Sequence, residues 1–317
     1  MQLVTDKYNR QFKTLRVSLL SRCNLSCAYC TMGEDNTKEN NNQSLAPAND
    51  LLDTIQKLHR VLDLQTIRLT GGEPLLYPHL IEVIKGIADM GIPEIKLTTN
   101  GLLLERMAKP MKDAGMQSIN VSLDAVDEDV FFLISKRNHL QKILDGIDAA
   151  LAVGLNVKIN SVIMKGMNDS QVLPLLQFAF ERNITIRFLE VMAMGHLHND
   201  PLKYLFTQEE ILSAARTKYS FEKVIRKDSA TSNYWQTKDG HVFGIIANES
   251  EPFCHDCNRL RLDSDGNIYG CLSSNHPISL KNVTDGDLLR SKLQEAMFQK
   301  QAVKFIGSEL SMLHIGG

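Results

Sequence analysis

Six cysteines supply the most distinctive chemistry of this 317-residue chain, and they fall into two groups of three. The groups lie near opposite ends of the sequence: Cys23, Cys27 and Cys30, then Cys254, Cys257 and Cys271. Three thiolates close together can hold three irons of a cubane iron–sulfur cluster, which leaves the fourth iron open to a further ligand. The sequence therefore predicts two clusters, each with an open coordination position.

Disulfides and zinc are the alternatives for these cysteines. A disulfide in the first group leaves one thiol unpaired, and the loop from Cys23 to Cys30 has no histidine to complete the four ligands of a zinc site. In the second group, His255 or His276 can complete such a site. A cluster is favoured there because the first group already indicates cluster chemistry, and zinc stays open as the alternative.

The composition is that of an ordinary globular protein, with 43% hydrophobic and 23% charged residues. A net charge of −2 gives no electrostatic reason to expect nucleic acid or a membrane surface as a partner. Residues Met1–Lys13 lack the apolar stretch of a signal peptide, and no apolar run is long enough to span a membrane. We therefore expect a cytoplasmic protein whose thiols stay reduced and available for metal or redox chemistry.

Strands and helices alternate through the first two thirds of the chain. The expected strands are Leu15–Leu20, Thr66–Thr70, Glu94–Thr99, Ser118–Leu123, Asn156–Ile163 and Thr185–Val191. The expected helices between them are Asn49–Leu62, Pro78–Met90, Leu102–Ala114, Leu140–Val153 and Ser170–Arg182. Such alternation predicts a parallel sheet with right-handed crossovers.

Polar or special residues follow nearly every one of these strands. The first cysteine group follows the first strand, Gly71–Pro74 follows the second, and Thr98–Asn100 ends the third. Ser122 and Asp124 end the fourth strand, and Glu190–Met192 ends the sixth. A barrel brings such residues together at one mouth, whereas an open sheet gathers them at one switch point. The sequence therefore predicts an α/β fold, an incomplete (β/α)6 TIM-like barrel.

After about residue 200 the pattern changes to hairpins and helices. The expected elements are a helix Gln208–Tyr219, two hairpins (Tyr234–Thr237 with His241–Ile246, and Arg259–Asp263 with Asn267–Cys271) and a helix Asp287–Gln299. We expect two domains, a barrel over residues 4–227 and an α+β domain over 228–317 that carries the second cluster. The chain ends in Gly316-Gly317, which is small enough to enter a narrow channel.

The segment from Cys23 to Cys30 resembles the cysteine signature of the radical S-adenosylmethionine (SAM) superfamily. Gly71-Gly72-Glu73-Pro74 resembles the glycine-rich motif of that superfamily, and glycine suits it because only glycine lets the backbone approach a ligand so closely. The resemblance implies a 4Fe-4S cluster whose open iron binds SAM, and a 5′-deoxyadenosyl radical that abstracts hydrogen. It also implies contacts to SAM from Tyr29, Gly72, Thr99, Ser122 and Met192.

The second cysteine group narrows the resemblance to one family, because Asn258-Arg259-Leu260-Arg261 follows Cys257. Further matches are spread over the chain: Val121–Asp124, Asp145–Ala150, Val157–Asn160, Gly166–Asp169, Ile186–Phe188 and Gly316–Gly317. The chain resembles the GTP 3′,8-cyclases, lyases that act first in molybdenum cofactor biosynthesis. The resemblance implies hydrogen abstraction from ribose C3′ of GTP and bonding of C3′ to C8, giving (8S)-3′,8-cyclo-7,8-dihydroguanosine 5′-triphosphate.

The same resemblance assigns roles to the cysteines and to several basic residues. The first cysteine group would hold the SAM cluster, and the second a further 4Fe-4S cluster whose open iron binds guanine. The GTP pocket would be lined by Arg16, Arg68, Lys158, Arg187, Arg259 and Arg261. Of these, Arg259, Arg261 and Lys158 are the catalytic candidates. Guanidinium groups bind phosphate bidentately and keep their charge, and Arg259 and Arg261 point to one face of a strand.

Three segments depart from the family pattern. Thr31-Met32-Gly33 replaces the Met-Pro that usually follows the third cysteine, and Thr66 stands where a lysine is common. Leu76-Tyr77-Pro78 lacks the usual arginine after the glycine-rich motif. These changes leave both cysteine groups intact and concern phosphate binding.

The resemblance also implies partners: GTP, a reductant such as flavodoxin, a cyclic pyranopterin monophosphate synthase that receives the product, and a second copy in a homodimer. Two rival functions stay open. One is another radical SAM enzyme that acts on a peptide or a different nucleotide, and the other is a zinc-binding interaction protein without catalysis. Neither nucleic acid nor a membrane is expected as a partner.

Overall fold

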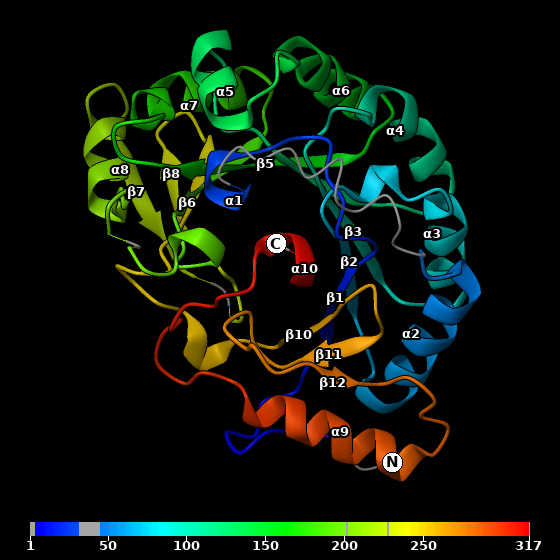
Figure 1. Cartoon of the computed structure of the whole chain (residues 1–317). Coiled ribbons are helices and arrows are strands. Elements are labelled where there is room, and N and C mark those ends of the chain that lie inside the picture. Colours follow the sequence, from blue (N-terminus) through cyan, green and yellow to red (C-terminus); the bar gives the residue numbers. More distant parts are fainter. Residues whose placement is uncertain (1–3, 32–44, 201, 227, 317) are drawn as a thin grey trace.

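In the computed structural model, which describes residues 4–31, 45–200, 202–226 and 228–316, six strands pair in parallel and in chain order. They are β1 (Thr14–Ser18), β2 (Thr66–Thr70), β3 (Glu94–Thr99), β4 (Ser118–Ser122), β5 (Asn156–Ile163) and β6 (Thr185–Glu190). The helices between them include α2 (Ala48–Leu62), α3 (Leu80–Asp89), α4 (Leu104–Asp113), α6 (Leu140–Ala152) and α7 (Val172–Glu181). Figure 1 shows the strands forming a curved sheet with these helices outside it. We call the inner side of this curve the lumen. The predicted partial barrel is confirmed.

Alternation along the strands separates an apolar outer layer from a polar lumen. In β2 and β3, Ile67, Leu69 and Ile95 are fully buried in the core that the sheet shares with the helices. Successive side chains of a strand point to opposite faces, so Arg68 and Lys96 face the lumen. The helices cover the apolar face, and the polar face is left for the site.

Strands from the last third of the chain extend both edges of the sheet. On one side β9 (Val242–Ile246) pairs in parallel with β6 and is followed by β8 (Asn233–Thr237) and β7 (Phe221–Val224). On the other side β10 (Arg259–Leu262) pairs in parallel with β1 and is followed by β11 (Asn267–Tyr269) and β12 (Ile278–Ser279). Both predicted hairpins are therefore present. The expected boundary between residues 227 and 228 falls between β7 and β8, which pair with each other, so the division into two domains stays a prediction.

Several elements escaped the sequence prediction. Helix α5 (Glu128–Ser135) begins at Asp127, whose side chain accepts a hydrogen bond from the backbone N–H of Val130. The apolar residues of this helix follow one another without a clear helical period. Two of them, Phe132 and Leu133, are 47% and 41% exposed. Strands β7 and β12, which were also not expected, are short strands at the two edges of the sheet. The helix expected over Gln208–Tyr219 is confirmed as α8 (Gln208–Arg216). Among the described helices, none is both long and apolar enough to cross a lipid bilayer.

The C-terminal segment returns into the lumen. Helix α9 (Gly286–Phe298) lies outside the sheet, whereas the short helix α10 (Met312–Ile315) lies at the centre of the ring of strands in Figure 1. The expected entry of the tail into a channel is thus seen for Gly316, and Gly317 lies outside the described residues.

The buried carboxylate of Glu190 ties the end of β6 to two later segments. It is 1% exposed and accepts hydrogen bonds from the backbone N–H groups of Gln208 (2.8 Å), Glu249 (2.8 Å) and Ser250 (3.0 Å). A neutral amide at this position would present its own N–H to one of these donors, which leaves a buried donor unpaired.

Replacing Glu190 by Gln is therefore expected to lower the free energy of unfolding by about 2–3 kcal/mol. Urea denaturation followed by circular dichroism measures the change. The matched control is E209Q, because the Glu209 side chain is 76% exposed. Equal midpoints for E190Q and E209Q would contradict the role of Glu190.

Candidate active site

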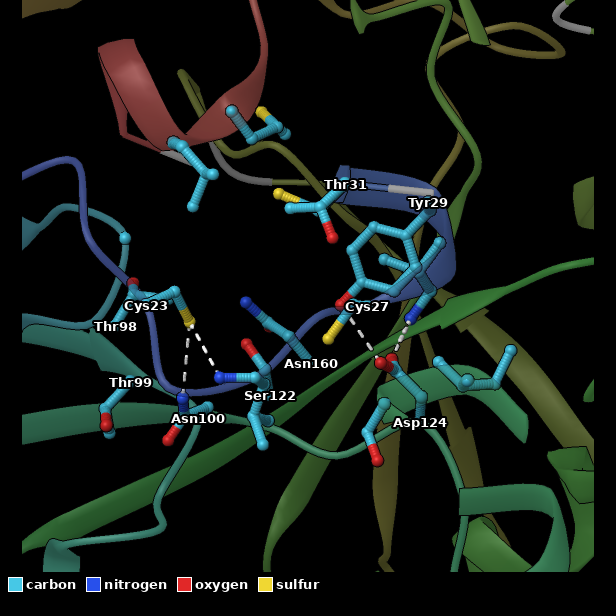
Figure 2. Close-up of a pocket in the computed structure, with 18 of the residues that line it drawn as sticks. Cys23, Cys27, Tyr29, Thr31, Thr98, Thr99, Asn100, Ser122, Asp124 and Asn160 are labelled. Carbon is cyan, nitrogen blue, oxygen red and sulfur yellow. Dashed lines mark hydrogen bonds between the residues drawn. The ribbon is translucent and has the colours of Figure 1, made fainter. Parts of the chain in front are cut away.

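The first cysteine group lies beyond the C-terminal end of β1, where the chain leads into α1 (Ala28–Thr31). Its three cysteines line one pocket, together with residues from the ends of β2, β3 and β4. Figure 2 shows the sulfur atoms of Cys23 and Cys27 directed into the same open space. The barrel mouth therefore gathers the first group as the sequence predicted.

Glycine is required at position 72 because two backbone segments touch there. The N–H of Gly72 donates to the carbonyl oxygen of Leu20 at 2.7 Å. A Cβ on Gly72 would lie 2.3 Å from the carbonyl oxygen of Arg22, closer than any side chain tolerates. The end of β2 therefore packs directly on the loop that carries Cys23, and this contact fixes one wall of the pocket.

The three thiols of the first group are half-buried, in surroundings that disfavour negative charge. Burial, reinforced by the charge of Glu73, raises the pKa of Cys23 to about 11. Burial, reinforced by Cys23, raises the pKa of Cys30 to about 12. The Nδ2 of Asn100 donates weakly to the Cys23 sulfur, at 3.6 Å. Thiolates at these positions need a bound cation, and the irons of a cluster supply that charge, so the cysteines fit a cluster.

Two buried carboxyl groups orient the pocket wall. Glu73 accepts hydrogen bonds from Thr99 Oγ1 (2.7 Å) and from the backbone N–H of Asn100 (2.7 Å), and burial raises its pKa to about 7. Asp124 accepts from the hydroxyl of Tyr29 at 3.0 Å, and burial raises its pKa to about 6. Each acid thus fixes a residue that was expected to contact SAM.

Four of the five residues expected to contact SAM line the pocket with the first cysteine group: Tyr29, Gly72, Thr99 and Ser122. Met192 is not among the described residues that line it. It follows β6 and packs beside Ala193 and Met194 in a small separate apolar cluster. The assignment of all five as SAM contacts stays a prediction.

The second cysteine group lies at the opposite end of the parallel strands. Cys254 is in the single turn η4 (Cys254–Asp256), Cys257 follows it, and Cys271 comes after β11. Arg259 at the start of β10 is in register with Thr14 at the start of β1. Because Cys23 follows the end of β1, the lumen separates the two groups along the strand direction.

Three cationic side chains form hydrogen bonds or an ion pair with the loop that carries Cys254 and Cys257. Arg10 Nη1 donates to the carbonyl oxygen of Cys254 at 2.8 Å, and Arg226 pairs with Asp256 at 2.8 Å. Lys300, which is 7% exposed, donates to the Cys257 sulfur at 3.2 Å and also to the carbonyl oxygen of Arg259. The loop is therefore held from three separate parts of the chain.

Cys257 of the second group has cations as its nearest charged neighbours, which none of the thiols of the first group has. Burial by itself raises the pKa of Cys257, but Lys300 and Arg259 outweigh it and lower the pKa to about 6. Burial and the two neighbouring cysteines raise the pKa of Cys254 to about 11. At least one thiol of this group is therefore favoured as the thiolate that metal binding needs.

The spacing of the ligands bears on the zinc alternative. Within the described ranges, no three histidine, cysteine or acidic side chains converge closely enough to hold one metal ion. All six cysteines are free thiols. A cubane binds each cysteine through a different iron, which sets the sulfurs further apart than around a single zinc.

The basic residues expected to bind GTP share the lumen. They are Arg16, Arg68, Lys158, Arg187, Arg259 and Arg261. Burial, followed by the charges of Arg261 and Arg68, lowers the pKa of Arg16 well below its ordinary range. Burial and Arg187 likewise lower the pKa of Arg68 to about 9. Burial is the larger cause for both residues and the neighbouring positive charges add to it; an anionic ligand would offset the repulsion between these charges.

Several of these guanidinium groups also have unused donors. Among the described residues, buried N–H groups without a hydrogen-bond partner include Arg16 Nε, Arg187 Nε and Nη2, and Arg259 Nη2. A buried donor without a partner is costly, and a charged one more so. The lumen therefore offers both charge and directed donors to a phosphate.

The C-terminal tail lies between the two cysteine groups. Met312 and Leu313 line the first pocket, and Arg261 Nη1 donates to the carbonyl oxygens of Ile315 (3.3 Å) and Gly316. Gly316 has a φ of +70°, and a Cβ there would lie 2.5 Å from Thr70 Cγ2. Only glycine fits this position.

Sequence reasoning missed several residues of the site. Glu73, Asn100 and Asp124 were expected at the strand ends of the barrel mouth but were given no role, and the structure shows that they support the first pocket. Lys96 alternates with buried Ile95 and Leu97, so its direction into the lumen was also readable. Lys300 gave no signal, because its contact to Cys257 is purely tertiary.

Comparison with known proteins agrees with this geometry. The Radical SAM superfamily profile matches residues 17–179, and the profile of Molybdenum Cofactor Synthesis C matches residues 184–306. The chain belongs to the radical SAM superfamily. A GTP 3′,8-cyclase of Staphylococcus carnosus is 36% identical over 310 residues, covering 92% of this chain and 89% of the relative. One from Nautilia profundicola is 36% identical over 307 residues, covering 94% and 93%. Within the superfamily, the chain belongs to the GTP 3′,8-cyclase family.

Solved structures share the fold at low sequence identity. Streptococcus suis SuiB bound to S-adenosylmethionine superposes with a TM-score of 0.66 at 14% identity, covering 92% of this chain and 69% of SuiB. Native anSMEcpe with bound AdoMet gives a TM-score of 0.63 at 15% identity, covering 89% and 82%. This likeness confirms the radical SAM fold.

Replacing Lys300 by Met removes the donor to Cys257 and leaves the second group without its nearest cation. After anaerobic loading, we expect this variant to release iron at about tenfold lower concentrations of a competing chelator than the wild type, since outer-shell partners tune metal affinity by such factors. The matched control is K304M at an exposed position four residues on. Identical release of iron from K300M and wild type would contradict the role of Lys300 in stabilising the second group.

Proposed function

We propose that this chain converts GTP into (8S)-3′,8-cyclo-7,8-dihydroguanosine 5′-triphosphate, the first step of molybdenum cofactor biosynthesis. One observation carries the proposal: two cysteine groups stand at opposite ends of one lumen, and the wall between them is cationic. An anionic nucleotide fits such a space with its base at one group and its ribose toward the other. Membership of the GTP 3′,8-cyclase family supports the same conclusion.

The first group suits a 4Fe-4S cluster that binds SAM. Its three cysteines would each bind one iron, and the candidates for contact with SAM are Tyr29, Gly72, Thr99, Ser122 and Met192. When bound, the reduced cluster and SAM supply a 5′-deoxyadenosyl radical. Phe131 and Ile134 add apolar surface to this pocket, which helps to keep water from a reactive species.

The second group and its surroundings would hold GTP. Cys254, Cys257 and Cys271 suit a second 4Fe-4S cluster, and Arg259 and Arg261 stand beside it on β10. Burial lowers the pKa of Lys158, and the charges of Arg187, Lys96 and Arg68 lower it further. An ammonium in such surroundings gives up a proton more readily than an ordinary lysine. Lys158, Arg259 and Arg261 are therefore the proposed catalytic residues.

The finer partners follow from the family and are part of the proposal. A one-electron reductant such as flavodoxin would reduce the first cluster, and a cyclic pyranopterin monophosphate synthase would take up the product. A homodimer and a place in the cytoplasm complete the proposed setting. The six free thiols agree with a reducing compartment.

Anaerobically reconstituted protein should contain about eight irons per chain if both groups hold cubanes. With SAM, dithionite and GTP it is expected to form 5′-deoxyadenosine and the cyclised triphosphate together, as followed by liquid chromatography and mass spectrometry. Deoxyadenosine without a product from GTP would favour another radical SAM activity. Two zinc ions and no iron would favour the non-catalytic interaction protein.

The variant C257A separates the two cysteine groups in this assay. Its iron content should fall to about four per chain, because only the first group still holds a cubane. It should still cleave SAM but form no cyclised triphosphate. Unchanged product formation by C257A would contradict the role of the second group in holding the substrate.

Shortening the tail tests its part in the site. Deleting Gly316 and Gly317 is expected to abolish turnover while the spectra of both clusters stay normal. The reason is that the guanidinium group of Arg261 loses the carbonyl oxygen of Gly316 as its hydrogen-bond acceptor in the lumen. The point variant G316A should behave similarly, since its Cβ meets Thr70. G286A is the control, with open space around the added carbon. Full activity of the shortened chain would refute the role.

A further inference from the structure

Four neighbouring strands carry a cation at the same level of the sheet. Arg261 of β10 is in register with Arg16 of β1, Arg16 with Arg68 of β2, and Arg68 with Lys96 of β3. Each alternates with fully buried apolar residues on its strand, so all four face the lumen. We call these residues the cationic row. With strands roughly 4.8 Å apart, the row extends over about 14 Å.

Lys96 ends the cationic row and forms an ion pair with Glu94, whose charge also acts on Arg68. Its Nζ pairs with Glu94 Oε2 at 2.5 Å, and Thr66 Oγ1 donates to the same oxygen at 2.8 Å. The side chains of Lys96 and Glu94 are 28% and 52% exposed. An ion pair so open to solvent contributes little to stability. A stronger anion can therefore take the place of Glu94.

The charge of Lys96 also reaches the other basic residues of the lumen. It is one of the causes, after burial, that lower the pKa of Lys158. Like charges placed directly opposite on neighbouring strands destabilise a sheet, and three of the four row members are arginines that keep their charge. A row of this kind is unfavourable in the free protein and is stabilised by a ligand that carries several negative charges along its length.

We propose that Lys96 leaves Glu94 to bind the terminal phosphate of the nucleotide substrate, as the outermost cation of a polyphosphate-binding row. The row begins at β10, beside the second cysteine group where the guanine is proposed to bind, and it runs away from that group to β3. The terminal phosphate is the part of GTP furthest from the base. Glu94 and Thr66 hold the ammonium in place until the phosphate arrives. This inference rests on the proposed function.

The variant K96M tests this role by the number of phosphates on the ligand. Dissociation constants of GTP, GDP and GMP are measured by equilibrium dialysis with anaerobic protein that carries both clusters. We expect K96M to raise the constant for GTP about tenfold, as for the loss of one charge-assisted hydrogen bond, and the constant for GMP less than twofold. K96R keeps the charge and should stay within about threefold of the wild type for GTP.

Further variants separate phosphate binding from a structural effect. K109M is the matched control, because Lys109 pairs with Asp113 on an exposed helix at 2.8 Å. E94Q removes the competing carboxylate and should leave GTP binding equal or tighter. K96Q, which keeps a polar but uncharged and shorter side chain, should show the same selective loss as K96M. Iron content and circular dichroism confirm that each variant is folded and loaded.

The outcomes distinguish this inference from the proposed function. If the wild type binds GTP and forms the cyclised product but K96M binds GTP equally well, the role of Lys96 is wrong and the function stands. An equal loss of GTP and GMP binding in K96M, or weaker GTP binding in E94Q, also overturns the role. If the wild type neither binds nor converts GTP, the proposed function itself is wrong.

Discussion

The parallel pairing of β10 with β1 is the contact on which the rest of the site depends. It joins segments from the two ends of the chain, with Thr14 opposite Arg259 and Arg16 opposite Arg261. Because the strands run in the same direction, Cys257 falls near the start of β1, whereas Cys23 follows its end. One strand pair thus sets the two cysteine groups at opposite ends of the lumen. A slip of one residue would turn both arginines of β10 toward the apolar face, so the burial of Leu260 and Leu262 specifies the register and with it the site.

The two ends of the lumen carry different ionisable groups. Near the first group, the buried carboxyls of Glu73 and Asp124 disfavour further negative charge. Near the second, Lys300 and Arg259 favour it strongly enough to lower the pKa of Cys257. An anionic ligand is therefore stabilised at the second group and along the arginines, and it is kept from the first. The polarity of the site follows from which strands carry acids at their ends and which carry cations along their length.

Much of this arrangement could be predicted from the sequence, because it is encoded locally. Alternation of strands and helices along the chain predicts the parallel strands. The glycine-rich motif identifies Gly72, and the spacing of the cysteines identifies the two groups. Contacts between distant segments could not be predicted in this way. Nothing near Lys300 indicates that its side chain reaches Cys257, and no local pattern predicts that β9 and β10 extend opposite edges of one sheet. Such pairings depend on burial and register over the whole chain. The periodicity within one segment holds no information about them.

The tail shows how this global packing positions a chemical group. Arg261 is 8% exposed and lies in the lumen, where a guanidinium group without hydrogen-bond partners would have no fixed direction. The carbonyl oxygens of Ile315 and Gly316 accept its hydrogen bonds and hold one edge of the fork. Those carbonyls reach Arg261 because the chain turns at Gly316 with φ +70° and passes Thr70 without a side chain. The conformational freedom of one glycine therefore fixes the direction of a charge on a strand more than fifty residues earlier. A guanidinium held on one edge presents its other donors in a fixed direction, which is the condition for recognising a phosphate or a base rather than merely attracting it.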